Sequence, residues 1–241
     1  MGGDTGSLPE RMAEAARELQ DHQDDPQATF RHAVELACAN VEGCDAAGLS
    51  FVRQDRHVET VAATDEMVVV ADRLQYEISE GPCLDSIWES RIVHSRHIAD
   101  DKRWPVWGPR VVAETAARSI LAFRLFTHGD TLGALNLYSC SSDGFHDSAE
   151  EEGLALAAHI ATAVAASQQI HQLVKGLDTR TYIGQATGIL MERFDLDGDA
   201  AFKVLARYSS THNVKLRDVA AELIRTRALP NDIGGHSRTG R

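Results

Sequence analysis

Apolar residues recur at helical spacing near the start of the chain. The polar residues 1–27 are predicted to form a leader that contains a short helix at PERMAEAARELQDHQ. From about Ala28 to Asn40, apolar side chains follow one another at steps of three and four residues, which predicts an amphipathic helix. Its predicted apolar face comprises Phe30, Val34, Ala37 and Cys38.

Two β-hairpins are predicted further along. GCDAAGLSFVR and HVETVAATD are short runs rich in Val, Ala and Phe on either side of RQDR. SILAFRLFTHGDTLGALNLYS is the clearest strand signal, because two apolar runs flank a turn at His128, Gly129 and Asp130. Between the hairpins we expect a mostly helical stretch to Ser90, a strand at IVHS and a loop at HIADDKRWPVWGP. These elements predict an α+β domain whose antiparallel sheet is flanked by helices.

A long helix follows FHDSAEEEG, over GLALAAHIATAVAASQQIHQLVKGLDTR. Its apolar positions recur at steps of three and four for more than five turns, a pattern typical of helices that pair. These positions are Leu154, Ala157, Ala161, Val164, Ile170, Val174 and Leu177. Packing on its own domain is the alternative and is expected for the first half, whereas residues 168–180 lie too far along to reach the same sheet.

Three shorter helices are predicted near the C-terminus. The first begins at Thr181, Asp197 caps the second with Asp199 in its first turn, and the third follows THNV. Three short helices form a marginal bundle that needs support from the long helix and from a partner chain. The three apolar faces are Ile183, Ala186, Leu190 and Phe194; then Ala201, Leu205 and Tyr208; then Leu216, Val219, Ala220, Leu223 and Ile224.

Gly184 and Gly188 lie one turn apart inside the first of these helices. Each glycine destabilises a helix interior by roughly 1 kcal/mol relative to alanine, so the pair needs a reason. The helical repeat places both beside Arg180 and Met191. We favour close packing of a neighbouring helix as the reason; approach of an RNA backbone is the alternative, and both can hold at once.

Charge is distributed unevenly along the chain of 241 residues, which has a formal net charge of −12 and 43% hydrophobic residues. Eight cations and seven anions between residues 178 and 229 leave that segment at +1, and the tail from 230 adds another +1, so residues 1–177 carry −14. This asymmetry favours two functional halves; a solvated acidic domain beside a near-neutral one is the alternative. The overall negative charge counts against nucleic acid as a partner. Whether one segment can bind nucleic acid therefore has to be judged from the charges within that segment.

Targeting signals and cysteine spacing suggest the compartment. No apolar run approaches the roughly 18 residues of a membrane span, and MGGDTGSLPERM lacks the features of a signal peptide, so we expect a cytoplasmic protein that does not enter a membrane. The four cysteines show neither C-x-x-C spacing nor the density of a disulfide scaffold, and reduced thiols are expected.

The C-terminal segment RTYIGQATGILMERFDLDGDAAFKVLARYSSTHNVKLRDVAAELI resembles the ANTAR domain, a three-helix RNA-binding module of bacterial antitermination regulators. The preceding SEGPCLDSIWES, HIADDKRWP and LGALNLYS resemble a GAF sensor domain. The resemblance implies an α+β GAF domain joined by a long coiled-coil helix to an all-α three-helix ANTAR bundle. The expected segments are the leader 1–27, the GAF domain 28–167, the linker helix 168–179 continuing from about 148, the ANTAR domain 180–229 and a disordered tail 230–241.

The family implies a function without catalysis. Its members are dimers that bind a nascent transcript carrying paired hexanucleotide-loop hairpins, and they stabilise an antiterminator over a terminator. The long helix would be the coiled-coil relay between sensor and effector, and a homodimer is expected through it. Nothing resembles a receiver domain, so the input would be a ligand, a redox event or a partner protein. The sequence identifies no cofactor.

The candidate RNA contacts combine cations with groups able to bind bases. Lys215 and Arg217 begin the third helix, whose N-terminus offers free N–H groups to a phosphate. Asp218 and Glu222 follow and would repel RNA, and Thr187 stands where family members often carry Lys. For each cation taken singly, a solvated surface charge is the favoured interpretation. The candidates are Arg180, Gln185, Gly188, Lys203, Arg207, Asn213, Lys215 and Arg217, with Tyr182 and His212 as further base contacts.

Cys83 is the most notable residue of the sensor domain. It follows Pro82 at a predicted helix start, where its pKa could be lowered, although a buried and inert thiol is favoured. His94 and His97 lie in a strand-to-loop segment without further ligands, so no metal site is predicted. The candidate ligand pocket, which could equally be core, consists of Tyr76, Cys83, Trp104 and Phe123.

Two alternatives remain open at this point. Some GAF domains are free methionine sulfoxide reductases, and Cys83 would then be catalytic, but Cys38 and Cys44 are poorly placed to resolve it. The second alternative is a sensor that acts through a partner protein and whose bundle does not bind RNA. The loss of a positive charge at Thr187 and the modest local charge keep this second alternative open.

Overall fold

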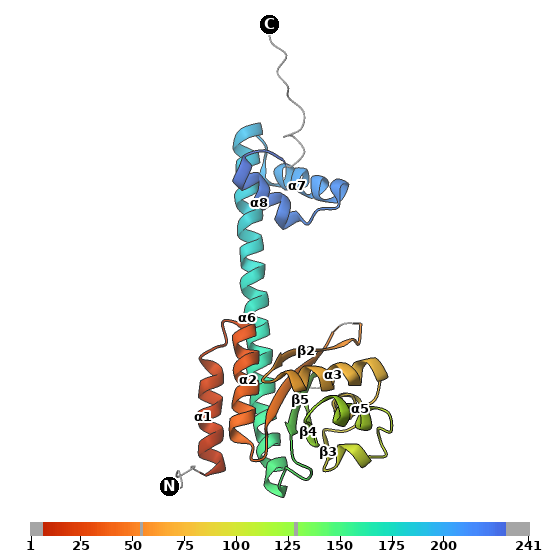
Figure 1. The fold of residues 1–241 in the computed structure, drawn as a ribbon. Coiled ribbons are helices and arrows are strands. Elements are labelled where there is room, and N and C mark those ends of the chain that lie inside the picture. The colour runs from red at the N-terminus through yellow and green to blue at the C-terminus, as the bar shows by residue number, and fades with distance from the viewer. Residues whose placement is uncertain (1–6, 54, 128–129, 230–241) are drawn as a thin grey trace. The chain divides into compact units, whose positions relative to one another are not determined.

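The structure is a computed structural model that describes residues 7–53, 55–127 and 130–229 (Figure 1). The chain divides into two compact units, Met1–His171 and Gln172–Arg241. The expected turn at His128 and Gly129 and the expected disordered tail lie outside the described residues. The boundary between the two units falls inside one long helix, α6 (Asp147–Phe194).

Five strands form the sheet of the first unit. Every neighbouring pair is antiparallel, so both predicted hairpins and the predicted strand at IVHS are confirmed. In spatial order the strands are β2 (Val58–Ala63), β1 (Ala46–Val52), β5 (Asp130–Ser139), β4 (Ser119–Thr127) and β3 (Ile92–Ser95).

Helices cover both faces of this sheet (Figure 1). Alternation along β4 sends Leu121, Phe123 and Leu125 into one apolar core and Ile120 and Ala122 into the other. The first core contains α1 (Leu8–Gln20), α2 (Pro26–Asn40) and the N-terminal part of α6. The opposite face carries α3 (Glu66–Ile78), α4 (Pro82–Trp88), the short 3-10 helix η1 (Ile98–Asp100) and α5 (Trp107–Glu114).

Two segments are more structured than the sequence suggested. The helix inside the predicted leader is α1, whose Met12, Ala15 and Leu19 are buried in the first core. The predicted loop at HIADDKRWPVWGP contains η1 and the first turn of α5, and buried Trp107 donates a hydrogen bond through Nε1 to the carbonyl of Ala71 at 3.1 Å. For α1 the sequence predicted the helix but not its burial, whereas η1 and α5 are short elements with weak local signals that tertiary burial stabilises.

The helix α6 is one continuous element of 48 residues. The expectation that a separate helix begins at Thr181 is therefore wrong. No proline or capping turn interrupts the segment, and the hydroxyls of Thr179 and Thr181 donate to the carbonyls of Lys175 and Leu177, within the helix itself.

The second unit consists of the rest of α6 with α7 (Gly198–His212) and α8 (Leu216–Thr226). The expected cap of α7 is confirmed, because the Asp197 carboxylate accepts from the N–H of Ala200 at 2.7 Å. Phe194, expected on the apolar face, is 59% exposed instead. The buried core of this unit is Ala186, Leu190, Ala201, Leu205, Val219, Ala220 and Leu223.

Within the described residues, no helix is long and apolar enough to cross a membrane. This agrees with the absence of a long apolar run in the sequence.

Gly133 allows β1 and β5 to lie close together, and a substitution at this position tests that contact. A Cβ atom at Gly133 would lie only 1.7 Å from the carbonyl oxygen of Ser50, so we expect Gly133→Ala to lower the free energy of unfolding by about 2 kcal/mol or more. Gly176→Ala is the matched control, because nothing lies within 4 Å of that position and alanine should stabilise the helix by up to about 1 kcal/mol. Urea unfolding checks both, and equal effects would contradict the close approach.

Candidate functional sites

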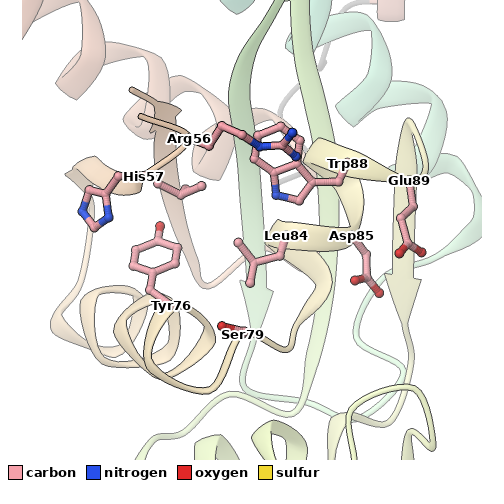
Figure 2. Close-up of a pocket in the computed structure, with 9 residues that line it drawn as sticks. Arg56, His57, Tyr76, Ser79, Leu84, Asp85, Trp88 and Glu89 are labelled. Atoms are coloured by element: carbon pink, nitrogen blue, oxygen red, sulfur yellow. The ribbon is translucent and has the colours of Figure 1, made fainter. Parts of the chain in front are cut away.

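A cavity of about 400 Å³ lies beside the start of β2, between α3 and α4 (Figure 2). Leu84 and Trp88, and likewise Asp85 and Glu89, are four residues apart and therefore share one face of α4. The lining residues are Arg56, His57, Val58, Tyr76, Ser79, Leu84, Asp85, Trp88 and Glu89. The cavity thus offers the rings of Tyr76 and Trp88, one imidazole, one guanidinium, one serine hydroxyl and two carboxylates.

Arg56 and Trp88 border this cavity from different elements. The guanidinium carbon of Arg56 lies 4.4 Å from the centroid of the Trp88 ring, within the range of a cation–π contact. Arg56 has a φ of 64°, in the left-handed region, and its N–H donates to the carbonyl of Arg53 at 2.9 Å. The tight turn before β2 therefore directs the cation toward α4, as Figure 2 shows.

A buried polar network lies next to the cavity and shares Tyr76 with it. The Tyr76 hydroxyl donates to Ser50 Oγ at 2.9 Å and is 2.9 Å from Thr60 Oγ1. At its centre, the fully buried Asp72 carboxylate accepts hydrogen bonds from five side chains, and burial raises the pKa of Asp72 above its ordinary value. The five donors are Ser50, Thr60, Gln75, Asn136 and Tyr138.

Cys83 belongs to this interior and does not face solvent. Its backbone N–H, at the start of α4, donates to Gln75 Oε1 at 2.8 Å. Burial, assisted by the charge of Asp72, raises the pKa of the Cys83 thiol to about 12. The thiol is therefore protonated at neutral pH, as expected for an inert buried cysteine.

Of the four residues expected to form a ligand pocket, three lie in or beside this cavity and the fourth does not. Tyr76 lines the cavity, Cys83 is buried next to it, and Trp104 donates through Nε1 to the lining residue Asp85 at 2.8 Å. Phe123 lies on the opposite face of the sheet, so close to α6 that a Cβ at Gly153 would be 2.3 Å from its ring. Arg56, Trp88 and Glu89 were not predicted, although the four-residue spacing within LDSIWE was a detectable signal for α4.

The two histidines of the H-x-x-H pair have different surroundings. His94 Nδ1 lies 2.9 Å from Glu150 Oε1, whereas His97 caps η1. In the part of the chain that the structure describes, no group of three His, Cys, Asp or Glu side chains could hold a metal ion.

In the second unit, the start of α8 gathers several of the predicted RNA contacts. Lys215 occupies the N-cap without a capping hydrogen bond from its side chain, so the first N–H groups of α8 can bind an anion. The guanidinium carbon of Arg217 lies 5.6 Å from the centroid of the Tyr182 ring on α6. Asn213, in left-handed conformation, ends α7 two residues before Lys215. An aromatic ring, two cations and a helix N-terminus therefore meet at one place.

Lys203 and Arg207 lie elsewhere, on the exposed side of α7. Arg207 lines a cavity of about 250 Å³ together with Tyr208 and His212. The rings of Tyr208 and His212 stack with their centroids 4.0 Å apart. This second group of cationic and aromatic side chains is formed by α7 alone with Leu229.

The glycine pair of α6 faces open space. A Cβ added at Gly184 or Gly188 would meet no atom within 4 Å, so among the described residues no helix of the same chain packs against them. They continue a regular series at alternating steps of four and three residues, which we call the α6 seam: Ile170, Val174, Leu177, Thr181, Gly184, Gly188 and Met191. Val174 and Leu177 are 52% and 61% exposed.

Thr187 is half-buried, and its hydroxyl donates to the carbonyl of Ile183 at 2.7 Å. A neutral side chain is thus satisfied within the helix at this position. Arg180 and Gln185 are exposed on α6, beside the seam.

The architecture is that of a sensor domain followed by a helical effector domain. The sequence profile of the GAF domain matches residues 23–165, more than half of the chain, and the profile of the ANTAR domain matches residues 171–224. The chain therefore belongs to the GAF domain family and carries an ANTAR domain behind the GAF domain. These two domains are those of an RNA-binding antitermination regulator with a sensor domain.

Solved structures share the fold of the first unit. The free methionine-R-sulfoxide reductase from Neisseria meningitidis is 14% identical, with a TM-score of 0.51 over 70% of this chain and 95% of that chain. The GAF domain of a phosphoenolpyruvate-protein phosphotransferase from Coxiella burnetii is 16% identical, with a TM-score of 0.50 over 68% of this chain and 98% of that chain. At these identities the similarity shows the fold alone. No curated protein matches the chain.

The Asp72 network predicts a specific pH dependence of stability. Because folding raises the pKa of Asp72 above its unfolded value of about 3.9, this group destabilises the native state progressively as pH rises from the unfolded to the folded pKa. Asp72→Asn lacks this ionisation. The difference between its free energy of unfolding and that of the wild type should therefore increase in favour of the variant by about 1.4 kcal/mol per pH unit within that interval. Urea unfolding over a pH series measures it, and a difference independent of pH would contradict the raised pKa.

Proposed function

We propose that the second unit binds hairpin loops of nascent RNA and thereby promotes antitermination. The observation that carries this proposal is the uncapped start of α8, where Lys215 and Arg217 meet the exposed ring of Tyr182. Phosphate binding at a helix N-terminus and stacking of splayed bases on an aromatic ring are two of the interactions used in hairpin-loop recognition.

The remaining predicted contacts surround this site or enlarge it. Asn213 adds a side-chain amide at the end of α7, and Lys203 and Arg207 supply further cations on α7. Arg180, Gln185 and Gly188 would extend contact along α6. Asp218 and Glu222 on α8 oppose phosphate, so contact should decline beyond the first turn of that helix.

We propose further that the protein is a homodimer joined through the α6 seam. The series begins at the half-buried Ile170 and continues through the exposed Val174, Leu177, Thr181, Gly184, Gly188 and Met191. Its heptad spacing fits the same series of a second copy, and the two glycines permit close approach of the helix backbones. Two linked RNA sites then gain from effective concentration when they bind paired hairpins.

The first unit would supply the input without catalysis. A small molecule in the cavity between α3 and α4 could contact Trp88 and Tyr76 and pair with Arg56 or Glu89. As a regulator acting on nascent transcripts, the protein would work in the cytoplasm. Functional segments at 28–167, 168–179 and 180–229 are part of this proposal.

The first test is titration against an RNA with two hexaloop hairpins at several salt concentrations. Lys215→Ala/Arg217→Ala should weaken binding about tenfold or more and lower the salt slope by about 1 to 2, because two phosphate contacts are lost. Lys175→Ala/Arg225→Ala is the matched control: it removes the same charge from the same unit, but Arg225 is already paired with Glu222 at 2.6 Å.

Equal weakening in both variants would contradict a specific site at the start of α8. Absence of binding, with the fold and the dimer intact and candidate ligands present, would favour a sensor that acts through a partner protein.

The seam is tested by Leu177→Glu. A buried carboxylate opposite its own copy is unfavourable, so we expect the dimer dissociation constant to rise by about tenfold or more. Gln172→Glu is the control, because the repeat of about 100° per residue places it on the other side of α6. Sedimentation equilibrium measures both. A wild-type protein that stays monomeric, or a dimer indifferent to Leu177→Glu, would contradict this interface.

A further inference from the structure

Cys38 and Cys44 form a pair of neighbouring thiols at the end of α2. Cys38 lies in the last turn of the helix, and Cys44 lies in the turn that leads to β1. Cys38 Sγ donates to the carbonyl oxygen of Cys44 at 3.5 Å, and Cys44 Sγ donates to the carbonyl oxygen of Ala46 at 3.3 Å. Both side chains are partly exposed, so a small oxidant can reach them. The sequence spacing alone gave no indication of this contact.

The two thiols differ in acidity. Interaction with the Cys44 side chain lowers the pKa of Cys38 to about 7, although burial and the nearby Asp45 act in the opposite direction. The same interaction and burial raise the pKa of Cys44. Cys38 is therefore the more acidic thiol of the two. An accessible acidic thiol next to a second thiol is the arrangement found in peroxide-reactive sites.

The remaining cysteines are poorer candidates. Cys83 is fully buried, in the apolar cluster on the other face of the sheet. Cys140 is exposed, but desolvation and Asp45 raise its pKa, so it is less ionised at neutral pH.

We propose that Cys38 and Cys44 are a dithiol site that hydroperoxides oxidise to a disulfide, and that this site is a redox input of the sensor domain. The regulatory use rests on the proposed function, whereas the thiol chemistry does not.

The chemistry balances with a hydroperoxide as the oxidant. The Cys38 thiolate attacks the peroxide, the O–O bond breaks, and the alcohol or water leaves after taking up a proton, which gives a sulfenic acid at Cys38. The sulfur of Cys44 then attacks that sulfur, the S–O bond breaks and water leaves with the proton of Cys44. Two thiols lose two electrons, and one peroxide is reduced.

The turn that carries the pair is attached to α6. Arg11 donates to the carbonyl of Asn40 at 2.9 Å and to Glu152 Oε1 of α6 at 2.6 Å. The N–H of Glu42 lies 3.5 Å from Glu152 Oε2. A disulfide would close the ring that contains Asn40 and Glu42, so oxidation would constrain the contacts that hold this turn to the second turn of α6.

The experiment treats the full chain with stoichiometric hydrogen peroxide and maps thiols by peptide mass spectrometry. Wild type and Cys140→Ser, the matched control, should both lose the two thiols of Cys38 and Cys44, become about 2 Da lighter and recover with dithiothreitol. Cys44→Ser should instead hold a sulfenic acid at Cys38 that dimedone captures, and Cys38→Ser should form no disulfide. Oxidation first at Cys140, or no disulfide between Cys38 and Cys44, would overturn the site.

Hydrogen exchange of residues 147–156 tests the input separately. In oxidised wild type and oxidised Cys140→Ser, the amide exchange rates of this segment should differ at least several-fold from those of the reduced forms. In Cys38→Ser, treatment with peroxide should leave these rates unchanged. A disulfide without such a change would overturn the assignment as an input. Neither measurement involves RNA, so a failure of RNA binding would contradict the proposed function and leave this site standing.

Discussion

One continuous helix has to satisfy two separate hydrophobic cores, and most other features of the molecule follow from this constraint. Leu156, Ile160 and Val164 of α6 are buried in the first unit, and Ala186 and Leu190 are buried in the second. Between these two sets, helical hydrogen bonds are satisfied internally, so the segment needs no tertiary support to keep its backbone bonded. Its apolar side chains, however, remain in water, which disfavours an isolated chain. A regular apolar series left open on such a helix is the physical basis for proposing a second copy.

The sequence predicted those elements whose periodicity runs long enough to dominate local alternatives. The hairpins alternate strongly, and the faces of α7 and α8 repeat over whole helices, so Leu205 and Val219 lie in the core as expected. The start of the first bundle helix, the packing of the predicted helix α1 and the content of the Trp-rich loop were harder to predict. Leu19 and Trp107 are buried by distant residues, and such contacts have no local signal.

The candidate sites were predictable to different degrees for the same reason. Lys215 and Arg217 were placed at a helix start by the apolar stripe that follows them, a pattern that needs only neighbouring residues. Alternation along a strand shows which residues share a face of the sheet. Which of the two faces borders a cavity depends on the packing of the whole domain, so the sequence did not reveal that Phe123 and Tyr76 lie on opposite sides of the sheet. Likewise, the spacing of Gly184 and Gly188 indicated a helix face without side chains that something approaches closely. The sequence could not distinguish a neighbouring helix of the same chain from a separate molecule.

The strongly acidic composition does not decide against RNA, because electrostatic interactions between exposed charges are screened beyond about 8 Å at physiological ionic strength. Most of the negative charge belongs to residues 1–177, whereas the cations at the start of α8 have Asp218 as their nearest acidic neighbour along the chain. Coulomb attraction at a phosphate is therefore governed by a few local groups and by the N–H groups of the helix. The same screening implies that such a site gives modest affinity alone, so linking two of them in one dimer contributes more than adding charge would.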